Sequence, residues 1–260
     1  MRKHSLHGAA FTAAIALLLT GAPAFAADDA AIQQAIEARF EKKNVAEEAE
    51  VRVDVEGGEV TLTGVANSLP ASRQAEKLAR KEAKVVDNRI RVHIEEPVKD
   101  GEIIAGVRKA ILNDPRYGIF DHVEFGVSDG AVLLVGSVVQ PWKKSSIESR
   151  VARVAGVRAI KNDIAVQSFT RFDSDLRTSL ARQIYGDPRF IQYGQRSHPP
   201  IRILVDRGHV TLAGWVNSPV ERAVLGTIAL STPSFSVSNE LRVDGEVPEE
   251  DKKPEEETVL

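Results

Sequence analysis

Few residues of this 260-residue chain lie at spacings that support catalysis. Residues 126–130 (Gly-Val-Ser-Asp-Gly) match the G-x-S-x-G pattern of a nucleophile elbow, which places its serine on a turn between a strand and a helix. Here the pattern falls inside a predicted β-hairpin, so Ser128 lacks that context. Four histidines follow residue 26: His93, His122, His198 and His209. None pairs with another at a metal-ligand spacing, and the chain has no cysteine, so we expect no enzyme, no metal site and no cofactor.

Two groups of basic residues are candidates for binding. The first follows one face of a predicted helix at i, i+4, i+7 and i+11: Arg73, Lys77, Arg80 and Lys84. The second opens another predicted helix with an indole and two ammonium groups: Trp142, Lys143 and Lys144. An aromatic ring beside lysines suits a lipid headgroup layer, because the ring favours the interface and the lysines meet phosphates. We therefore take both groups as candidate lipid-binding residues.

Each group also has an ordinary interpretation. Glu76 and Glu82 dilute the charge of the first helix, and a solvated charged face is the default for a surface helix. The ring of Trp142 can instead fold back onto its own sheet. The sequence leaves both interpretations open.

The bulk composition is that of a soluble globular protein, with 43% hydrophobic and 27% charged residues. The formal net charge of -3 combines a basic start with an acidic end, and the body between them is neutral. Nucleic-acid capture needs clustered positive charge, so we expect no nucleic-acid partner.

Residues 1–26 have the three regions of a secretory signal peptide: a basic start, an apolar run and a small-x-small site at Ala24-Phe-Ala26. We expect a mature chain in the periplasm that begins at Ala27. Without a cysteine the mature chain has no disulfide and no site for a lipoprotein anchor, and no later stretch is long enough to span a membrane.

The elements that would position the candidate residues occur three times. Strand, tight turn and strand recur at 51–64, 123–136 and 201–214. Each copy carries one glycine in the turn (Gly58, Gly130, Gly208) and another six residues later (Gly64, Gly136, Gly214). A helix precedes each hairpin, with an aspartate that suits an N-cap: Asp29, Asp100 and Asp173. A second helix with an early proline and a strand around an asparagine complete each copy.

These elements predict an α+β fold of three tandem α-β-β-α-β modules, each a three-stranded sheet with two helices on one face. Module 1 spans 28–96, module 2 spans 97–168 and module 3 spans 169–244. Residues 245–260 form an acidic tail that we expect to be disordered.

The pattern resembles the BON-domain family of bacterial envelope and osmotically induced proteins. The glycine after each hairpin and the closing Val-x-Asn-x-[Ile/Leu]-x-Val strand carry the resemblance, with asparagines Asn88, Asn162 and Asn239. Copy three departs from it, since residues 231–235 (Ser-Thr-Pro-Ser-Phe) replace the usual Gly-Val, and we expect its last helix to be shorter.

Two functions of different class follow. The resemblance implies a non-enzymatic periplasmic protein that binds anionic phospholipid and supports envelope integrity or the response to osmotic and envelope stress. The alternative is a soluble protein-interaction or chaperone-like protein that uses its open sheet faces and edges. The sequence indicates neither which module binds nor the oligomeric state.

Overall fold

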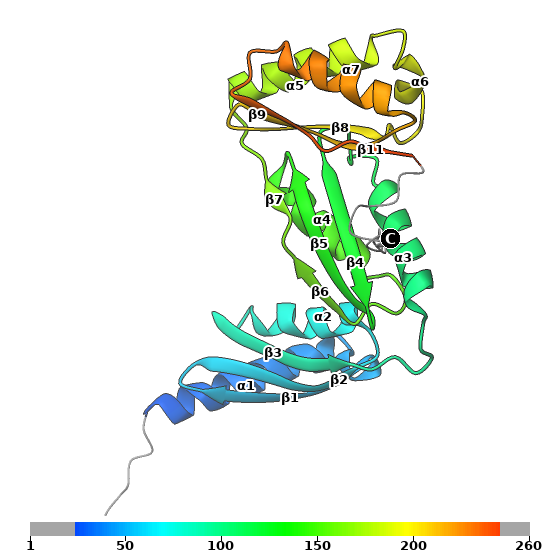
Figure 1. Ribbon diagram of the computed structural model, residues 1–260. Helices are drawn as coiled ribbons and strands as arrows, with labels where there is room; N and C mark the ends of the chain where they lie inside the picture. The colour runs from blue at the N-terminus through cyan, green and yellow to red at the C-terminus, as the bar shows by residue number, and fades with distance from the viewer. Residues whose placement is uncertain (1–23, 245–260) are drawn as a thin grey trace, which may run out of the picture.

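The computed structural model describes the backbone of residues 24–244 and the side chains of residues 28–244. The predicted signal peptide, apart from its last three residues, and the predicted tail lie outside the described residues. The three modules follow one another in a row (Figure 1).

Each module has the predicted order of elements. Module 1 contains α1 (Ala24–Lys42), the short 3-10 helix η1 (Val45–Glu47), β1 (Ala49–Glu56), β2 (Glu59–Ala66), α2 (Leu69–Ala79) and β3 (Val85–Val92). Module 2 contains α3 (Asp100–Leu112), β4 (His122–Ser128), β5 (Ala131–Val138), α4 (Pro141–Val151), β6 (Ala159–Asn162) and β7 (Ala165–Val166). Module 3 contains α5 (Arg171–Tyr185), α6 (Ile191–Gly194), β8 (Ile201–Asp206), β9 (His209–Val216), α7 (Pro219–Leu230), β10 (Ser236–Asn239) and β11 (Arg242–Val243).

The hairpin strands are antiparallel, and the last strand of each module runs parallel to the central one. The second helix makes the crossover between these two parallel strands. In modules 2 and 3 a short break divides the last strand in two, so each of these sheets is assigned four strands. The predicted α+β fold of repeated modules is confirmed. The expected shortening of the last helix is wrong, because α7 has 12 residues whereas α2 and α4 have 11 each.

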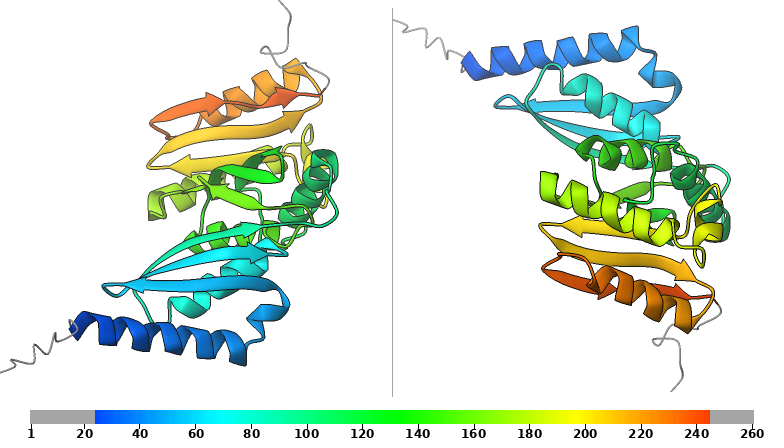
Figure 2. Two further views of the ribbon diagram at one scale, coloured as in Figure 1. Left: turned by 90° about the horizontal axis from the view of Figure 1, so that it is seen from below. Right: turned by 90° about the horizontal axis from the view of Figure 1, so that it is seen from above.

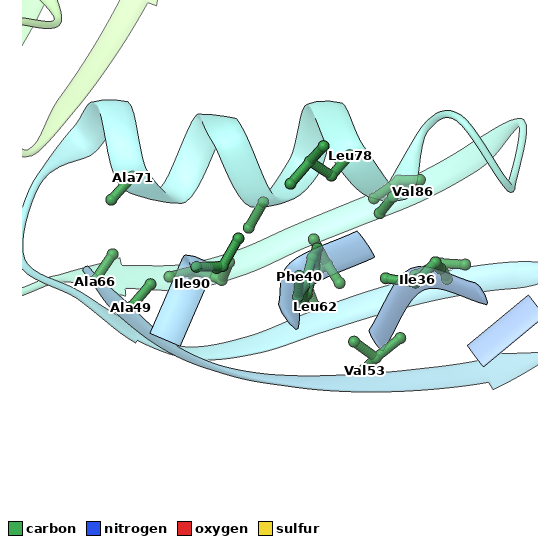
Figure 3. Close-up of a cluster of buried hydrophobic side chains, with 14 of the residues drawn as sticks. Ile36, Phe40, Ala49, Val53, Leu62, Ala66, Ala71, Leu78, Val86 and Ile90 are labelled. Carbon is green, nitrogen blue, oxygen red and sulfur yellow. The ribbon is translucent and has the colours of Figure 1, made fainter. Parts of the chain in front are cut away.

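The helices of each module cover one face of its sheet and enclose a mainly aliphatic core. In module 1, Ile36 and Phe40 of α1 and Leu78 of α2 meet Leu62 and Ile90 of the sheet (Figure 3). Figure 2 shows the same layering from two sides, with helices on one face of each module and strands on the other. Each core is built mainly from one module, but Leu69 of module 1 joins the core of module 2, and Phe120 of module 2 packs on the core of module 3.

The repeated glycines meet two backbone requirements. Both residues of each hairpin turn have positive φ: Gly57-Gly58, Asp129-Gly130 and Arg207-Gly208. Such turns match the twist of the paired strands and favour glycine. At Gly136 φ is 110°, and a Cβ there would strike the carbonyl oxygen of His122 on the facing strand. Gly64 and Gly214 occupy the same place in their hairpins.

The repeated aspartates do not act as N-caps, so that prediction is wrong. Asp29 lies inside α1 and accepts hydrogen bonds from the turn amides of Gly57 (2.8 Å) and Gly58 (2.7 Å). Asp100 begins α3 and accepts from the amides of Asp129 and Gly130, at 3.0 and 3.2 Å. Each carboxylate thus fastens the first helix of its module to the tip of the hairpin that follows, and we call this contact the aspartate clasp.

Module 3 uses the same aspartate clasp. Asp173 is fully buried and accepts from the amide of Gly208 and the hydroxyl of Ser168, both at 2.7 Å. The true N-cap of α5 is Thr170, whose hydroxyl accepts from the amide of Asp173. The aspartate and the turn glycine are therefore repeated in all three modules because they hydrogen-bond to each other.

The closing asparagines tie the last strand to the second helix. The side-chain amide of Asn162 donates to the Lys144 carbonyl (3.2 Å) and to Glu148 (2.8 Å), while its oxygen accepts from the amide of Ile164. Asn88 makes the equivalent contacts to α2, and Asn239 bonds to the backbone of α7.

A buried glutamine joins modules 2 and 3. The amide nitrogen of Gln167 donates to the Phe120 carbonyl (2.8 Å) and the Ser137 hydroxyl (3.2 Å). Its oxygen accepts from the amide of Val205 at 3.1 Å and from Arg177. The amide of Ile203 on β8 also donates to the Ile119 carbonyl of module 2. This edge of module 3 is therefore covered rather than open.

The aspartate clasp predicts acid sensitivity of module 3. Burial raises the pKa of Asp173, but hydrogen bonds from Ser168, Thr170 and Gly208 and the charge of Arg177 outweigh it, so the pKa lies below its ordinary value. A carboxyl with a lowered folded-state pKa stabilises the fold above its unfolded pKa, and that contribution is lost as the pH falls through the folded pKa.

We expect Asp173→Asn to lower the free energy of unfolding at pH 7 by about 2 kcal/mol. Below about pH 5, the free energy of unfolding should decrease less steeply with falling pH in this variant than in the unaltered protein. The exposed Asp175, two residues along α5, provides the control: Asp175→Asn should stay within about 0.5 kcal/mol. Urea unfolding at several pH values measures both. Equal effects of the two substitutions would contradict the role of the clasp.

Candidate functional site

The first candidate group lies on and just beyond α2. Ser68 caps this helix by accepting from the amide of Ala71, and Pro70 stands in its first turn, as predicted. The helix ends at Ala79 with Arg80 as its C-cap, so Lys84 does not continue the helical face and that placement is wrong. The sequence after Ala79 contains no helix breaker, but burial of Ala83 and Val86 in the core turns the chain towards β3.

Carboxylates already engage two arginines of this group. Arg73 forms an ion pair with Glu148 of module 2 at 2.5 Å, and Arg80 pairs with Glu76 at 2.8 Å. Lys77 and Lys84 are exposed, and neither takes part in an ion pair within the described part of the chain. The lysines, rather than the arginines, are free to meet an anionic ligand.

The second candidate group opens α4, whose first residue is Pro141. The ring of Trp142 is 43% exposed and does not fold back into the core. Arg116 lies over it at 4.8 Å from the ring centroid, and the ammonium of Lys143 lies 5.8 Å away. Cations at such distances over an indole are attracted by its electron-rich face. The indole is therefore held at the surface beside two cations.

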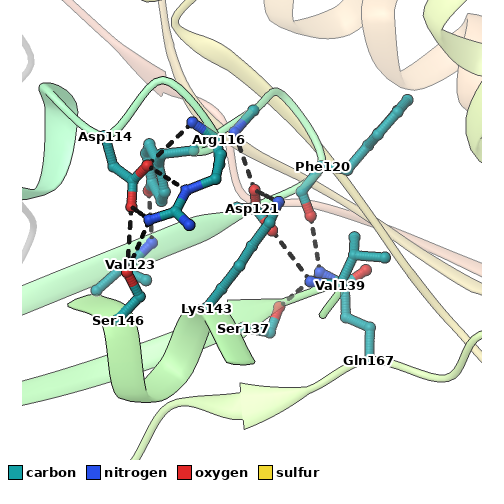
Figure 4. Close-up of polar contacts among 12 residues, drawn as sticks. Asp114, Arg116, Phe120, Asp121, Val123, Ser137, Val139, Lys143, Ser146 and Gln167 are labelled. Carbon is teal, nitrogen blue, oxygen red and sulfur yellow. Dashed lines mark hydrogen bonds and ion pairs between the residues drawn. The ribbon is translucent and has the colours of Figure 1, made fainter. Parts of the chain in front are cut away.

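Buried carboxylates hold these two cations (Figure 4). Asp121 is fully buried and accepts from the Lys143 ammonium at 2.5 Å and from the backbone amides of Gly118 and Val139. Asp114 is also buried; burial raises its pKa, but the guanidinium of Arg116 and its other partners bring the net pKa below the ordinary value. Lys143 is therefore a structural residue, and Lys144 keeps no ion-pair partner among the described residues.

The helices that carry the two candidate groups are joined by an ion pair. The Arg73–Glu148 ion pair joins α2 to α4. Lys77 stands four residues after Arg73, and Lys144 stands four residues before Glu148, so each lysine shares its helix face with one partner of the pair. We call Lys77 and Lys144 the α2–α4 surface; Trp142, two residues before Lys144, does not share its helix face.

Arg116 and Asp121 were missed at the level of sequence. The signal was present, because Asp-Pro-Arg occurs in two copies, at 114–116 and 187–189. The proline of this motif can stop a helix, and its aspartate pairs with its own arginine: Asp114 with Arg116 at 3.0 Å and Asp187 with Arg189 at 2.6 Å. Only the fold brings the first of these arginines to Trp142.

The G-x-S-x-G pattern and the acidic and histidine side chains of residues 28–244 have the following surroundings. Ser128 ends β4 beside a hairpin turn, so the nucleophile-elbow pattern has the hairpin context that was predicted. Within this range no three acidic or histidine side chains gather as they would around a metal ion. Burial lowers the pKa of His122, whose ring contacts Glu124.

Comparison with protein families gives a match in each module. The model of the BON domain matches residues 28–93, 99–168 and 173–245. The chain belongs to the BON-domain family. BON domains are associated with envelope and periplasmic proteins and are generally not enzymes. None of the curated proteins matches this chain. No helix in the described BON domains is long and apolar enough to cross a membrane.

Solved structures offer only distant likeness. The C-terminal domain of CdsD, the structural protein of the type III secretion system of Chlamydia trachomatis, is 12% identical over 81% of this chain and 96% of its own, with a TM-score of 0.24. The periplasmic domain of the type III secretion protein PrgH from S. typhimurium (fragment 170–392) is 14% identical over 78% and 98%, with a TM-score of 0.20. Likeness at this level transfers no property to the BON domains of this chain.

The ion pair of Lys143 separates its structural role from any role in binding. We expect Lys143→Met to lower the free energy of unfolding by about 3 kcal/mol, because it leaves the buried Asp121 without its cation. The neighbouring Lys144→Met should change it by no more than about 0.5 kcal/mol. Urea denaturation followed by tryptophan fluorescence measures both variants, and a small effect at Lys143 would show that Asp121 does not depend on it.

Proposed function

We propose that this chain is a non-enzymatic periplasmic envelope protein whose BON domains bind anionic phospholipid surfaces and support envelope integrity under osmotic or envelope stress. Membership of the BON-domain family supports the envelope location. The cleavable leader expected at residues 1–26 is consistent with export.

The observation that carries the proposal is the α2–α4 surface. Two elements chosen separately from the sequence are adjacent in space, joined by the Arg73–Glu148 ion pair. Lys77 and Lys144 have no ion-pair partner among the described residues and each stands one helical turn from a partner of that pair, while the exposed ring of Trp142 opens α4. Each lysine near an anionic membrane contributes about 1 kcal/mol of attraction to the headgroups, and an indole ring favours the interfacial layer of the membrane.

Because few cations of the two candidate groups are free of carboxylate partners, we expect their binding to a membrane to be weak and reversible. Arg73, Arg80 and Lys143 are paired with carboxylates, so they contribute little attraction at long range. Electrostatic attachment of this kind is screened by salt, and it needs a second, apolar contribution to become stable.

A second candidate function is favoured by the edge of β1. Among the described strands β1 pairs only with β2, and a groove of about 730 Å³ runs beside it between α1 and the edge. Phe40, Val45 and Val51 line this groove. A free edge beside an apolar groove suits an extended segment of another protein, which is the chaperone-like alternative.

Vesicle co-sedimentation tests the membrane proposal. The expected mature protein, residues 27–260, should be retained on phosphatidylglycerol-rich vesicles at low salt and not on phosphatidylcholine vesicles. Lys77→Glu and Lys144→Glu should each weaken retention about tenfold, because each reverses one charge at the membrane.

The matched control is Lys161→Glu. Lys161 is an exposed lysine on β6 that lies 3.0 Å from Asp163 and faces away from α4, and its reversal changes the net charge by the same amount. Equal losses for all three variants would mean that net charge alone governs retention. If neither type of vesicle retains the protein, the membrane proposal is wrong and the β1 edge becomes the leading candidate.

A further inference from the structure

Exposed aromatic rings gather at one end of module 3. Phe235 is 75% exposed and stacks on Phe172, which is 43% exposed, with ring centroids 5.9 Å apart. Both rings lie against the hairpin turn, because a Cβ at Gly208 would touch each of them. His209 contacts Phe235 edge-on. We call Phe172, Phe235 and the turn at Arg207-Gly208 the aromatic tip.

The repeat supplies an internal comparison for Phe235. The amide of Phe235 donates to the carbonyl of the turn glycine Gly208 at 2.8 Å, and in module 2 the amide of Arg158 donates to Gly130 at 2.8 Å. The parallel register places Lys84 at the same point of module 1, one residue before β3. Two modules therefore have a cation where module 3 has a phenylalanine.

Phe172 likewise stands where modules 1 and 2 have a charged residue. It directly precedes the clasp residue Asp173, as Asp28 precedes Asp29 and Lys99 precedes Asp100. The two positions thus hold Asp28 and Lys84 in module 1, and Lys99 and Arg158 in module 2. Because the same fold accepts charged side chains at both positions, folding does not require the two phenylalanines.

The departure of copy three from the family pattern produces this feature. Residues 231–235 replace the usual Gly-Val, yet α7 is not shortened, so the change alters the surface and leaves the helix intact. Exposed apolar side chains that lie in contact with one another mark sites of interaction, whereas single exposed ones are common on any protein surface. Phe169 and Leu230, on the segments that lead into the aromatic tip, are also exposed.

The shape and charge of the aromatic tip favour a lipid surface as its partner. The tip is the turn end of a hairpin and the start of a helix, at the end of module 3 away from α6 (Figure 1). Arg171 is 97% exposed and Arg207 stands in the turn itself. Asp173, the carboxylate at the tip, is buried and engaged, while Asp206 accepts from the Ser168 amide and Asp175 lies 4.0 Å from Arg171.

We propose that the aromatic tip of module 3 enters the interfacial layer of an anionic phospholipid membrane, with Phe172 and Phe235 at the acyl boundary and Arg171 and Arg207 at the phosphates. This inference rests on the proposed membrane function. It supplies the apolar contribution that the lysines of the α2–α4 surface lack.

The test of this inference replaces the two phenylalanines of the aromatic tip with the residues found at the same positions of module 2. The double variant Phe172→Lys/Phe235→Arg adds two positive charges, and module 2 shows that the fold accepts these side chains. Purely electrostatic binding would become tighter. We expect retention of residues 27–260 on phosphatidylglycerol-rich vesicles to fall at least about tenfold, because two rings no longer leave water. Phe172→Leu/Phe235→Leu, which stays apolar, should retain most of the binding.

The matched control lies at the other end of module 3. Ile191 and Val220 are also exposed apolar residues, on α6 and α7, and Ile191→Lys/Val220→Arg adds the same charge. This control should bind no more weakly than the unaltered chain.

The outcomes separate the two proposals. If the unaltered protein binds and the tip variant binds equally or more tightly, the inference about the tip is overturned while the membrane function stands. If the unaltered protein is not retained, the membrane function is overturned and this inference with it. If the tip variant only converts a dimer to a monomer, the tip is a contact between copies and the inference is overturned.

Discussion

The contact between an aspartate and the tip of a hairpin is the interaction on which each module depends. Adjacent amides of a turn with positive φ point the same way, and a single carboxylate can accept from both. In modules 1 and 2 it does so, and in module 3 the carboxylate adds a serine hydroxyl instead of a second amide. The clasp fixes where the first helix lies along the hairpin, so that the helix covers one face of the sheet.

The order of elements could be predicted because the signals are local and occur three times. Alternating apolar residues, turn glycines and early prolines each act within a few residues, and each forms the expected structure. The role of Asp100 could not be predicted in the same way. Its position before an apolar helix is also that of an N-cap, and its real partner, Gly130, lies 30 residues away.

The candidate site was predictable in its residue types but not in its electrostatics. Arg73 meets Glu148 across 75 residues, and Lys143 meets Asp121 across 22. Folding thus neutralises cations that look free in the sequence. It also ends α2 at Ala79, because packing of Ala83 overrides a sequence that would allow the helix to continue.

Repetition allows the modules to diverge at their surfaces while the clasp and the order of the main elements are kept. The bonds of Gln167 and the Ile203–Ile119 contact hold module 3 on module 2, so the aromatic tip has a fixed place on the molecule. Modules 1 and 2 keep charged residues at their tips. At the tip, module 3 therefore differs from the others in the chemistry of its side chains rather than in the path of its backbone.

The most direct measurement is hydrogen exchange of the whole chain with and without phosphatidylglycerol-rich vesicles. A protein that docks on membranes through these surfaces should show slower exchange in segments 206–209 and 231–236 and at the start of α4, with β1 unchanged. Slower exchange confined to the β1 edge, or no change anywhere, would contradict membrane docking by these surfaces.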